Sequence, residues 1–138
     1  MKDLIVGFGN QLRHALEIGA NVTLKQNNKE IHNVMITGLG GSGIGGTIVS
    51  ELTAQECTVP VCTNKGYDLP GYINENTLVI CSSFSGNTEE TLEAFEKAKA
   101  KNAEIACVSS GGKLIELAKA QNLNYIQLAP GDSPRAMM

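Results

Sequence analysis

Short apolar runs alternate along the chain with segments whose apolar residues recur every three or four positions. The runs cover residues 34–37, 59–63, 77–82, 105–108 and 124–128. Brief apolar runs bounded by glycine and polar residues are typical of strands buried inside a sheet. Because helical spacing separates one run from the next, the pattern predicts an α/β fold, a three-layer αβα sandwich with a five-stranded parallel sheet.

The predicted helices differ in what they carry. The first begins near Phe8, places Leu12 and Leu16 on one stripe and ends at Gly19. We expect this stripe to pack against another surface and to carry no chemistry. Further helices follow the first, third and fourth runs. Pro60 lies in the second run and cannot donate a hydrogen bond to a neighbouring strand, so that run is predicted to form an edge strand.

A glycine-rich loop, residues 38–46, joins the first run to the helical stretch that begins at Ile44. Glycine lets the backbone turn sharply and lets a ligand approach without meeting a Cβ atom. The free N–H groups and the positive dipole end of a helix start favour an anion. The loop therefore predicts an anion site with one hydroxyl, that of Ser42, and no lysine.

Known glycine motifs fit this loop poorly. Gly38, Gly40 and Gly43 match the dinucleotide pattern G-x-G-x-x-G, but a lone match is weak and the acidic residue expected about 20 residues later is missing. Ile44 stands where the phosphate loop of nucleotide hydrolases requires lysine. The same residue breaks the G-x-S-x-G elbow of serine hydrolases. Dinucleotide binding stays open as an alternative, which thermal-shift measurements with NAD and with fructose 6-phosphate would separate.

A second loop, residues 82–88, carries four hydroxyls between the third run and the next helix. Hydroxyls and backbone N–H groups can surround a phosphate monoester without a fixed positive charge. Ser85, Asn87 and Thr88 are also common helix caps, but capping explains only one of them. The two glutamates that follow are better explained by a favourable place near the helix dipole than by catalysis.

A third serine–glycine loop covers residues 109–112 and follows the fourth run. In parallel sheets, ligands bind beyond the carboxyl ends of the strands. The three serine–glycine loops should therefore converge at one edge of the sheet. His32 precedes the first run, at the opposite edge, and His14 lies off the apolar stripe of its helix, so neither is expected to be catalytic.

Composition narrows the classes of partner. The net charge of −3, the absence of a basic stripe and an aromatic content of 4% without Trp argue against nucleic acid. No apolar run approaches a membrane span, and the start of the chain lacks a signal-peptide pattern. Without C-x-x-C spacing, the cysteines are predicted to be reduced, mostly buried thiols of a cytoplasmic protein, not metal ligands. These residues are Cys57, Cys62, Cys81 and Cys107.

The loops resemble those of the amino-terminal sugar isomerase (SIS) domain of the bifunctional phosphoglucose/phosphomannose isomerase family. The resemblance covers essentially the whole chain and is carried by residues 36–46, 83–91 and 134–136. It implies a flavodoxin-like SIS fold and a hexose 6-phosphate ligand. The residues that it implies for the sugar phosphate are Gly41, Ser42, Ser83, Ser85 and Thr88.

The resemblance also implies a reaction, aldose–ketose isomerisation of glucose 6-phosphate or mannose 6-phosphate to fructose 6-phosphate, without metal or nucleotide. Arg135 would stabilise the enediolate intermediate, a role that suits a permanent cation with directional donors. In this family the proton-shuttling glutamate and a ring-opening histidine belong to a second domain. Ser133 and Pro134 open a helix that the sequence does not continue. We therefore expect residues 1–138 to be one domain, the amino-terminal half of a longer isomerase, which binds the sugar without converting it efficiently.

The family forms dimers through its SIS domains, so the resemblance implies a homodimer, with Phe8, Leu12, Met137 and Met138 near contact surfaces. A non-catalytic, phosphosugar-binding regulatory module is the alternative. A DNA-binding helical domain would favour that alternative, and these 138 residues contain none.

Overall fold

A single parallel sheet forms the centre of the protein in the computed structural model, which describes residues 6–130. The strand order is β2-β1-β3-β4-β5, and each neighbouring pair is parallel. The strands are β1 (Asn33–Thr37), β2 (Val61–Asn64), β3 (Thr77–Ser82), β4 (Glu104–Ser109) and β5 (Asn124–Gln127). The prediction of a five-stranded parallel sheet is therefore confirmed.

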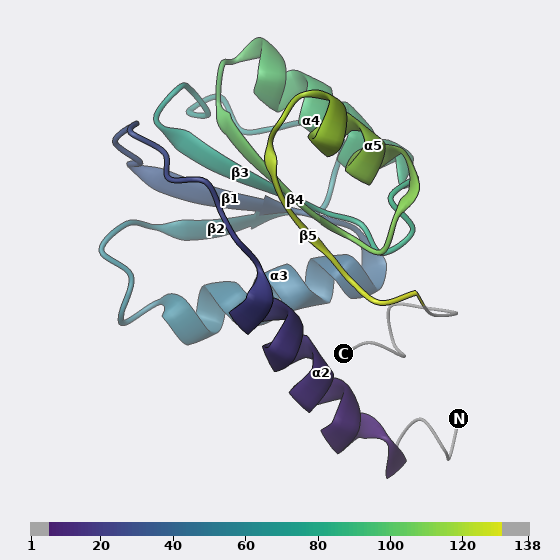
Figure 1. The fold of residues 1–138 in the computed structure, drawn as a ribbon. Coiled ribbons are helices and arrows are strands. Elements are labelled where there is room, and N and C mark those ends of the chain that lie inside the picture. Colours follow the sequence, from purple (N-terminus) through teal and green to yellow (C-terminus); the bar gives the residue numbers. More distant parts are fainter. Residues whose placement is uncertain (1–5, 131–138) are drawn as a thin grey trace.

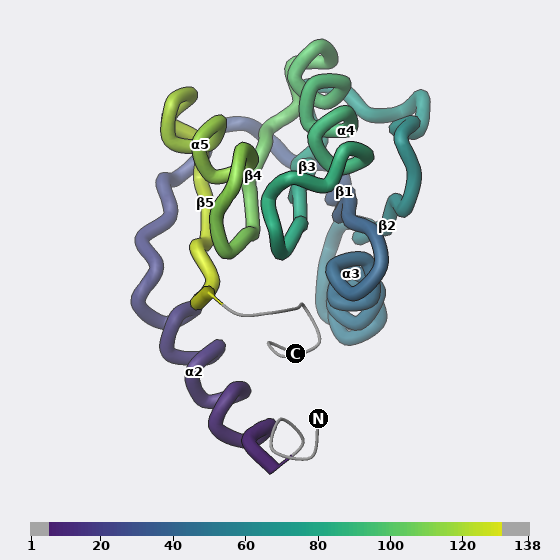
Figure 2. Tube along the Cα trace, turned by 90° about the vertical axis from the view of Figure 1, so that its right-hand side faces the viewer, coloured from purple at the N-terminus to yellow at the C-terminus, as the bar shows by residue number. Residues whose placement is uncertain are grey.

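Helices cover both faces of this sheet. The covering helices are α3 (Gly40–Thr53), α4 (Glu89–Ala100) and α5 (Gly112–Ala120), whereas a further helix, α2 (Phe8–Asn21), lies outside these layers. One face carries α4 and α5, packed on β3, β4 and β5, and the other carries α3, packed on β1 and β2 (Figure 1). Figure 2 looks onto the carboxyl ends of the strands, with α4 and α5 on one side of the strand row and α3 on the other. The three-layer αβα arrangement is confirmed.

The core lies between the sheet and helices α4 and α5. Side chains alternate along β3, so that Val79 and Cys81 point into the core and are fully buried. On β4 the same alternation buries Ile105 and Cys107. Phe95 of α4 fills the space between them with no exposed surface. This packing follows from the two-residue period of a strand set against the helical stripe of α4.

All four cysteines are free thiols, but only Cys81 and Cys107 are buried; Cys62 is half-buried and Cys57 is exposed, so the prediction of mostly buried cysteines holds for half of them. Burial raises the pKa of the Cys81 thiol well above its ordinary value. Burial also raises the pKa of Cys107 to about 12. Both side chains therefore stay neutral at physiological pH and act as small apolar core residues.

Helix α2 departs from the core and buries none of its side chains. The helix extends away from the sheet in both views (Figures 1 and 2). Phe8 and Leu12 are about half exposed, and Leu16 is 74% exposed. The stripe that we expected to pack against another surface finds no partner among residues 6–130.

The position and the start of strand β2 both reflect the missing N–H group of Pro60. β2 is an edge strand, as Pro60 predicted, but the strand begins only at Val61. Pro60 still contributes its carbonyl oxygen, which accepts a hydrogen bond of 2.9 Å from the N–H of Val34. No helix in the described part of the chain is long and apolar enough to cross a bilayer.

Candidate functional site

The three serine–glycine loops meet at the carboxyl edge of the sheet, as predicted. Thr37, the last residue of β1, pairs with Cys81 of β3, so the loops that follow these two strands start at almost the same height. The helix after β1 lies on one face of the sheet and the helix after β3 lies on the other. The crevice between β1 and β3 is therefore the topological switch point, where open α/β sheets bind their ligands.

Glycines in the first loop allow a close approach that no other residue permits. A Cβ atom on Gly38 would lie 2.7 Å from the carbonyl oxygen of Ser82, at the end of the neighbouring strand. A Cβ atom on Gly43 would lie 2.6 Å from the carbonyl oxygen of Gly38. Separations under 3.0 Å are sterically forbidden for a Cβ atom. Because these two positions lack a Cβ atom, the first turn of α3 can pack directly against the ends of β1 and β3.

Ser42 connects the first loop to the second. Its Oγ accepts a hydrogen bond of 3.1 Å from the backbone N–H of Phe84, which lies 42 residues later in the chain. The Ser42 side chain is half-buried, and its hydroxyl proton remains available to a ligand. The two loops that were predicted to share an anion are therefore in direct contact.

The second loop is organised around Ser83, which is 1% exposed. Its Oγ lies 2.8 Å from the Oγ1 of Thr88 and accepts a hydrogen bond of 3.1 Å from the N–H of Gly86. Ser85 is exposed, and its Oγ accepts from the N–H of Asn87 at 3.2 Å. The buried Ser83 therefore orients the Thr88 hydroxyl by hydrogen bonding to it, whereas Ser85 is exposed to solvent.

Helix capping does not account for these polar residues. Thr88 occupies the N-cap position of α4, yet its side chain makes no capping hydrogen bond. The Oδ1 of Asn87 accepts a hydrogen bond of 3.0 Å from the N–H of Lys113, in the first turn of a different helix, α5. Asn87 and Thr88 therefore bond elsewhere, Asn87 to α5 and Thr88 to Ser83. The Thr88 hydroxyl has one donor and two acceptor positions, so it can bind a ligand in addition to Ser83.

The third loop supports the second instead of facing a ligand. Ser110 Oγ and Ser109 Oγ donate hydrogen bonds of 2.6 and 3.3 Å to the carbonyl oxygen of Phe84. Gly86 has a φ of +72°, and a Cβ atom there would overlap the carbonyl oxygen of Gly111. Phe84 is consequently held from both sides, by Ser42 at its N–H and by the third loop at its carbonyl.

The electrostatic balance of the site is mixed. The amino-terminal ends of α3 and α4 both point their positive dipole ends toward the loops. Glu89 and Glu90 lie in the first turn of α4 and offset part of that positive field. Partial burial, together with these two carboxylates, raises the pKa of Tyr67. The field that the two helix ends offer to an anion is therefore weakened on the α4 side.

Sequence reasoning missed the segment that follows β2. The Nζ of Lys97 on α4 donates to the Tyr67 carbonyl oxygen at 3.1 Å and pairs with Asp68 at 2.7 Å. A hydrogen bond from Lys97 lowers the pKa of Asp68. The backbone register pairs Asn64 at the end of β2 with Thr37 at the end of β1. That register is the signal that brings the segment to the site.

Neither a metal nor a dinucleotide finds matching residues in this region. Among residues 6–130, no three His, Cys, Asp or Glu side chains come close enough together to hold a metal ion. The strand next to the glycine loop ends at Asn64, which is followed by Lys65. A dinucleotide ribose would need a carboxylate at that strand end.

Arg135, proposed for the enediolate, and Ser133, Pro134, Met137 and Met138 lie outside the described residues.

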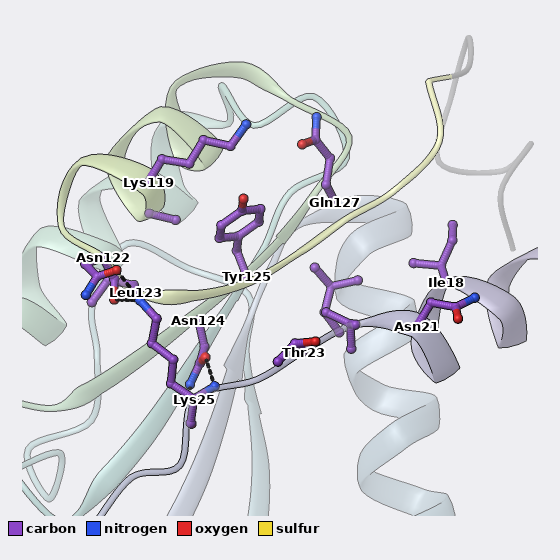
Figure 3. Close-up of a pocket in the computed structure, with 13 residues that line it drawn as sticks. Ile18, Asn21, Thr23, Lys25, Lys119, Asn122, Leu123, Asn124, Tyr125 and Gln127 are labelled. Carbon is purple, nitrogen blue, oxygen red and sulfur yellow. Dashed lines mark hydrogen bonds between the residues drawn. The ribbon is translucent and has the colours of Figure 1, made fainter.

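A cavity of about 670 Å³ lies away from the loops, along the outer edge of β5 (Figure 3). Its floor includes Tyr125, with the Nζ of Lys119 at 5.6 Å from the ring centroid. Asn124 closes one end by exchanging two hydrogen bonds with the backbone of Lys25, at 2.7 and 3.0 Å. None of the residues predicted to hold the sugar phosphate lines this cavity.

Comparisons with known proteins give a consistent result. No family model matches the chain. A bifunctional phosphoglucose/phosphomannose isomerase from Caldicellulosiruptor bescii is 43% identical over 138 residues, which are 100% of this chain and 41% of that protein. A protein of the same name from Aquifex aeolicus is 39% identical over 103 residues, or 74% of this chain and 32% of that protein. The chain thus spans about two fifths or less of the curated relatives that it matches.

A solved structure supports the fold. The tagatose-6-phosphate ketose/aldose isomerase from Escherichia coli superimposes with a TM-score of 0.65 over 99% of this chain and 40% of that chain, at 17% identity. At that level of identity, the match concerns the fold alone.

Proposed function

We propose that this chain, whose full length matches the amino-terminal region of the bifunctional phosphoglucose/phosphomannose isomerases, is an SIS domain that binds the phosphate of a hexose 6-phosphate. One observation carries the proposal: at the switch point of the sheet, Ser42 bonds to the N–H of Phe84, in the loop that holds the Ser83–Thr88 pair. Hydroxyls and the N–H groups of two helix starts are the donors that a phosphate monoester accepts. The ligands that we assign are Gly41, Ser42, Ser83, Ser85 and Thr88.

We further propose that the chain is one domain of a longer isomerase, a cytoplasmic enzyme of glycolysis and gluconeogenesis. Interconversion of a hexose 6-phosphate with fructose 6-phosphate moves a proton between C1 and C2, which requires a base within hydrogen-bond reach of the sugar. Glu89 and Glu90 are next to the phosphate loop, whereas the reacting carbons lie at the other end of the sugar. We therefore assign binding to these loops and charge stabilisation to Arg135, with the base supplied from outside residues 1–138.

The phosphate group should dominate affinity. In calorimetric titrations, we expect fructose 6-phosphate to bind and fructose, which lacks the phosphate, to bind at least about a hundredfold more weakly. In amide NMR spectra, fructose 6-phosphate should shift the signals of residues 41–42 and 83–88. Equal binding of the two sugars, shifts confined to the β5 cavity, or thermal stabilisation by NAD but not by fructose 6-phosphate would contradict the proposal.

Self-association is the second expected property. The apolar stripe of α2 lacks a partner among the described residues, and an exposed apolar face of this kind marks an interaction site. We propose that a second copy of the chain covers it, in line with the homodimer implied by the resemblance. Light scattering should give a dimer, and Leu16→Glu should shift the dissociation constant upward by about tenfold or more, because a charge would be buried at the contact.

Leu52→Glu tests the competing surface on α3, which also exposes Ile44 and Ile48; Leu52 is 74% exposed, as Leu16 is. The dimer of the Leu52→Glu variant should dissociate as the wild type does. A monomeric wild type at high concentration, or weakening by Leu52→Glu but not by Leu16→Glu, would exclude α2 as the contact.

A further inference from the structure

Lys65 follows β2 and lies against the glycine loop. The N–H of Gly38 donates a hydrogen bond of 3.1 Å to the carbonyl oxygen of Asn64, the residue before Lys65. The Cγ of Lys65 would be 3.6 Å from a Cβ atom on Gly43, so the lysine stem crosses the first turn of α3. The sequence contains no lysine within the glycine loop, but the fold brings one to it from the edge strand.

The positive charge of Lys65 has no salt-bridge partner among residues 6–130. A lysine is unfavourable at the positive end of a helix dipole, and this residue extends over that end of α3. Within residues 6–130, Lys65 makes none of the salt bridges, which involve Lys29, His32 and Lys97 instead. A bound anion would relieve the repulsion between the ammonium group and the helix end.

The backbone around Lys65 is anchored on both sides. The Nδ2 of Asn64 donates to the Gly66 carbonyl oxygen at 2.9 Å and reaches the Thr37 hydroxyl at 3.4 Å. Two residues later, the Tyr67 carbonyl oxygen accepts from Lys97 of α4. The segment thus spans from the start of α3 to α4 and fixes the backbone of Lys65, which is an exposed residue.

We propose that Lys65 is a further ligand-binding residue, whose ammonium group pairs with the phosphate held by Ser42, Ser83, Ser85 and Thr88. The inference rests on the proposed phosphosugar site and deepens it by supplying the positive charge that the three serine–glycine loops lack. Lysine acts here as a compact, strongly hydrated point charge on a flexible stem. Its contribution offsets the glutamates at the start of α4.

The test is a titration of fructose 6-phosphate into wild type, Lys65→Met and Lys65→Arg at several salt concentrations. Lys65→Met should weaken binding about tenfold at low salt, the size expected for losing one charge-assisted hydrogen bond. The variant's affinity should also fall less steeply with added salt, because one ion pair fewer is screened. Lys65→Arg keeps the charge and should bind within about threefold of the wild type.

Lys99→Met is the matched control, since it removes the same charge from the last turn of α4, at the opposite end of that helix. Its affinity and salt dependence should equal those of the wild type. If the wild type binds and Lys65→Met binds equally well, or if Lys99→Met weakens binding as much, the assignment of Lys65 is wrong while the phosphate site stands. If the wild type does not bind fructose 6-phosphate, both proposals fall.

Discussion

Gly86→Ala is expected to lower the free energy of unfolding by about 3 kcal/mol or more, combining left-handed backbone strain with steric overlap. Gly86 has a φ of +72°, and the new methyl group would overlap the carbonyl oxygen of Gly111. The second and third loops would have to separate, which would also displace Phe84 from the hydroxyls of Ser109 and Ser110. Thermal unfolding should show a midpoint roughly 10 °C lower.

Two other glycines separate the causes of this loss. Gly40 has a φ of +58° but open space where a Cβ would stand, so Gly40→Ala isolates the backbone strain and should cost only about 1 kcal/mol. Gly71 has neither a left-handed φ nor a neighbour within 4 Å, so Gly71→Ala should leave the midpoint unchanged. Equal midpoints for all three variants would show that the loops do not pack as described.

Ser83→Ala is expected to weaken binding of fructose 6-phosphate by roughly ten- to a hundredfold, the range for hydrogen bonds to a charged group. The substitution removes one proposed ligand and also the partner that holds Thr88 at 2.8 Å. The N–H of Gly86 would lose its hydrogen bond to the Ser83 hydroxyl at this buried position. Its hydrogen bond of 3.1 Å to the Ser83 carbonyl oxygen would remain. Titration calorimetry measures the affinity.

Thr53→Ala is the control for Ser83→Ala. It removes a hydroxyl that bonds only within α3, to the Val49 and Ser50 carbonyl oxygens, at the end of the helix far from the loops. This variant should bind as the wild type does. Wild-type affinity in Ser83→Ala, measured on a folded protein, would remove Ser83 from the site.

Much of the fold could be predicted from the local pattern of apolar residues and glycines, because neighbouring residues determine both buried strands and tight turns. β3 runs from Thr77 to Ser82, as the apolar run indicated. β4 extends one residue beyond the run at each end, because polar Glu104 and Ser109 still pair in the sheet. β2 starts later than its run, since Pro60 lacks the N–H that a ladder requires.

The contacts of the candidate site were less predictable, because they join residues that are distant in sequence. Nothing local indicates that Asn87 accepts from Lys113 of another helix instead of capping its own. The place of Lys65 depends on the register between β1 and β2, which no short motif encodes. Ser110 lies in a loop that was predicted to reach the ligand edge, yet its hydroxyl donates a hydrogen bond to the Phe84 carbonyl oxygen.

The hydrogen bond between Phe84 and Ser42 has a consequence for folding. It joins residues 42 positions apart, which the pairing of β1 with β3 brings together at the centre of the sheet. Such a non-local contact carries a loop-closure cost that must be met before the contact contributes stability. A sugar phosphate held there would bind only the assembled chain, and mass action would then favour the native state over partly assembled sheets. The metabolite would act as a folding ligand for the whole domain.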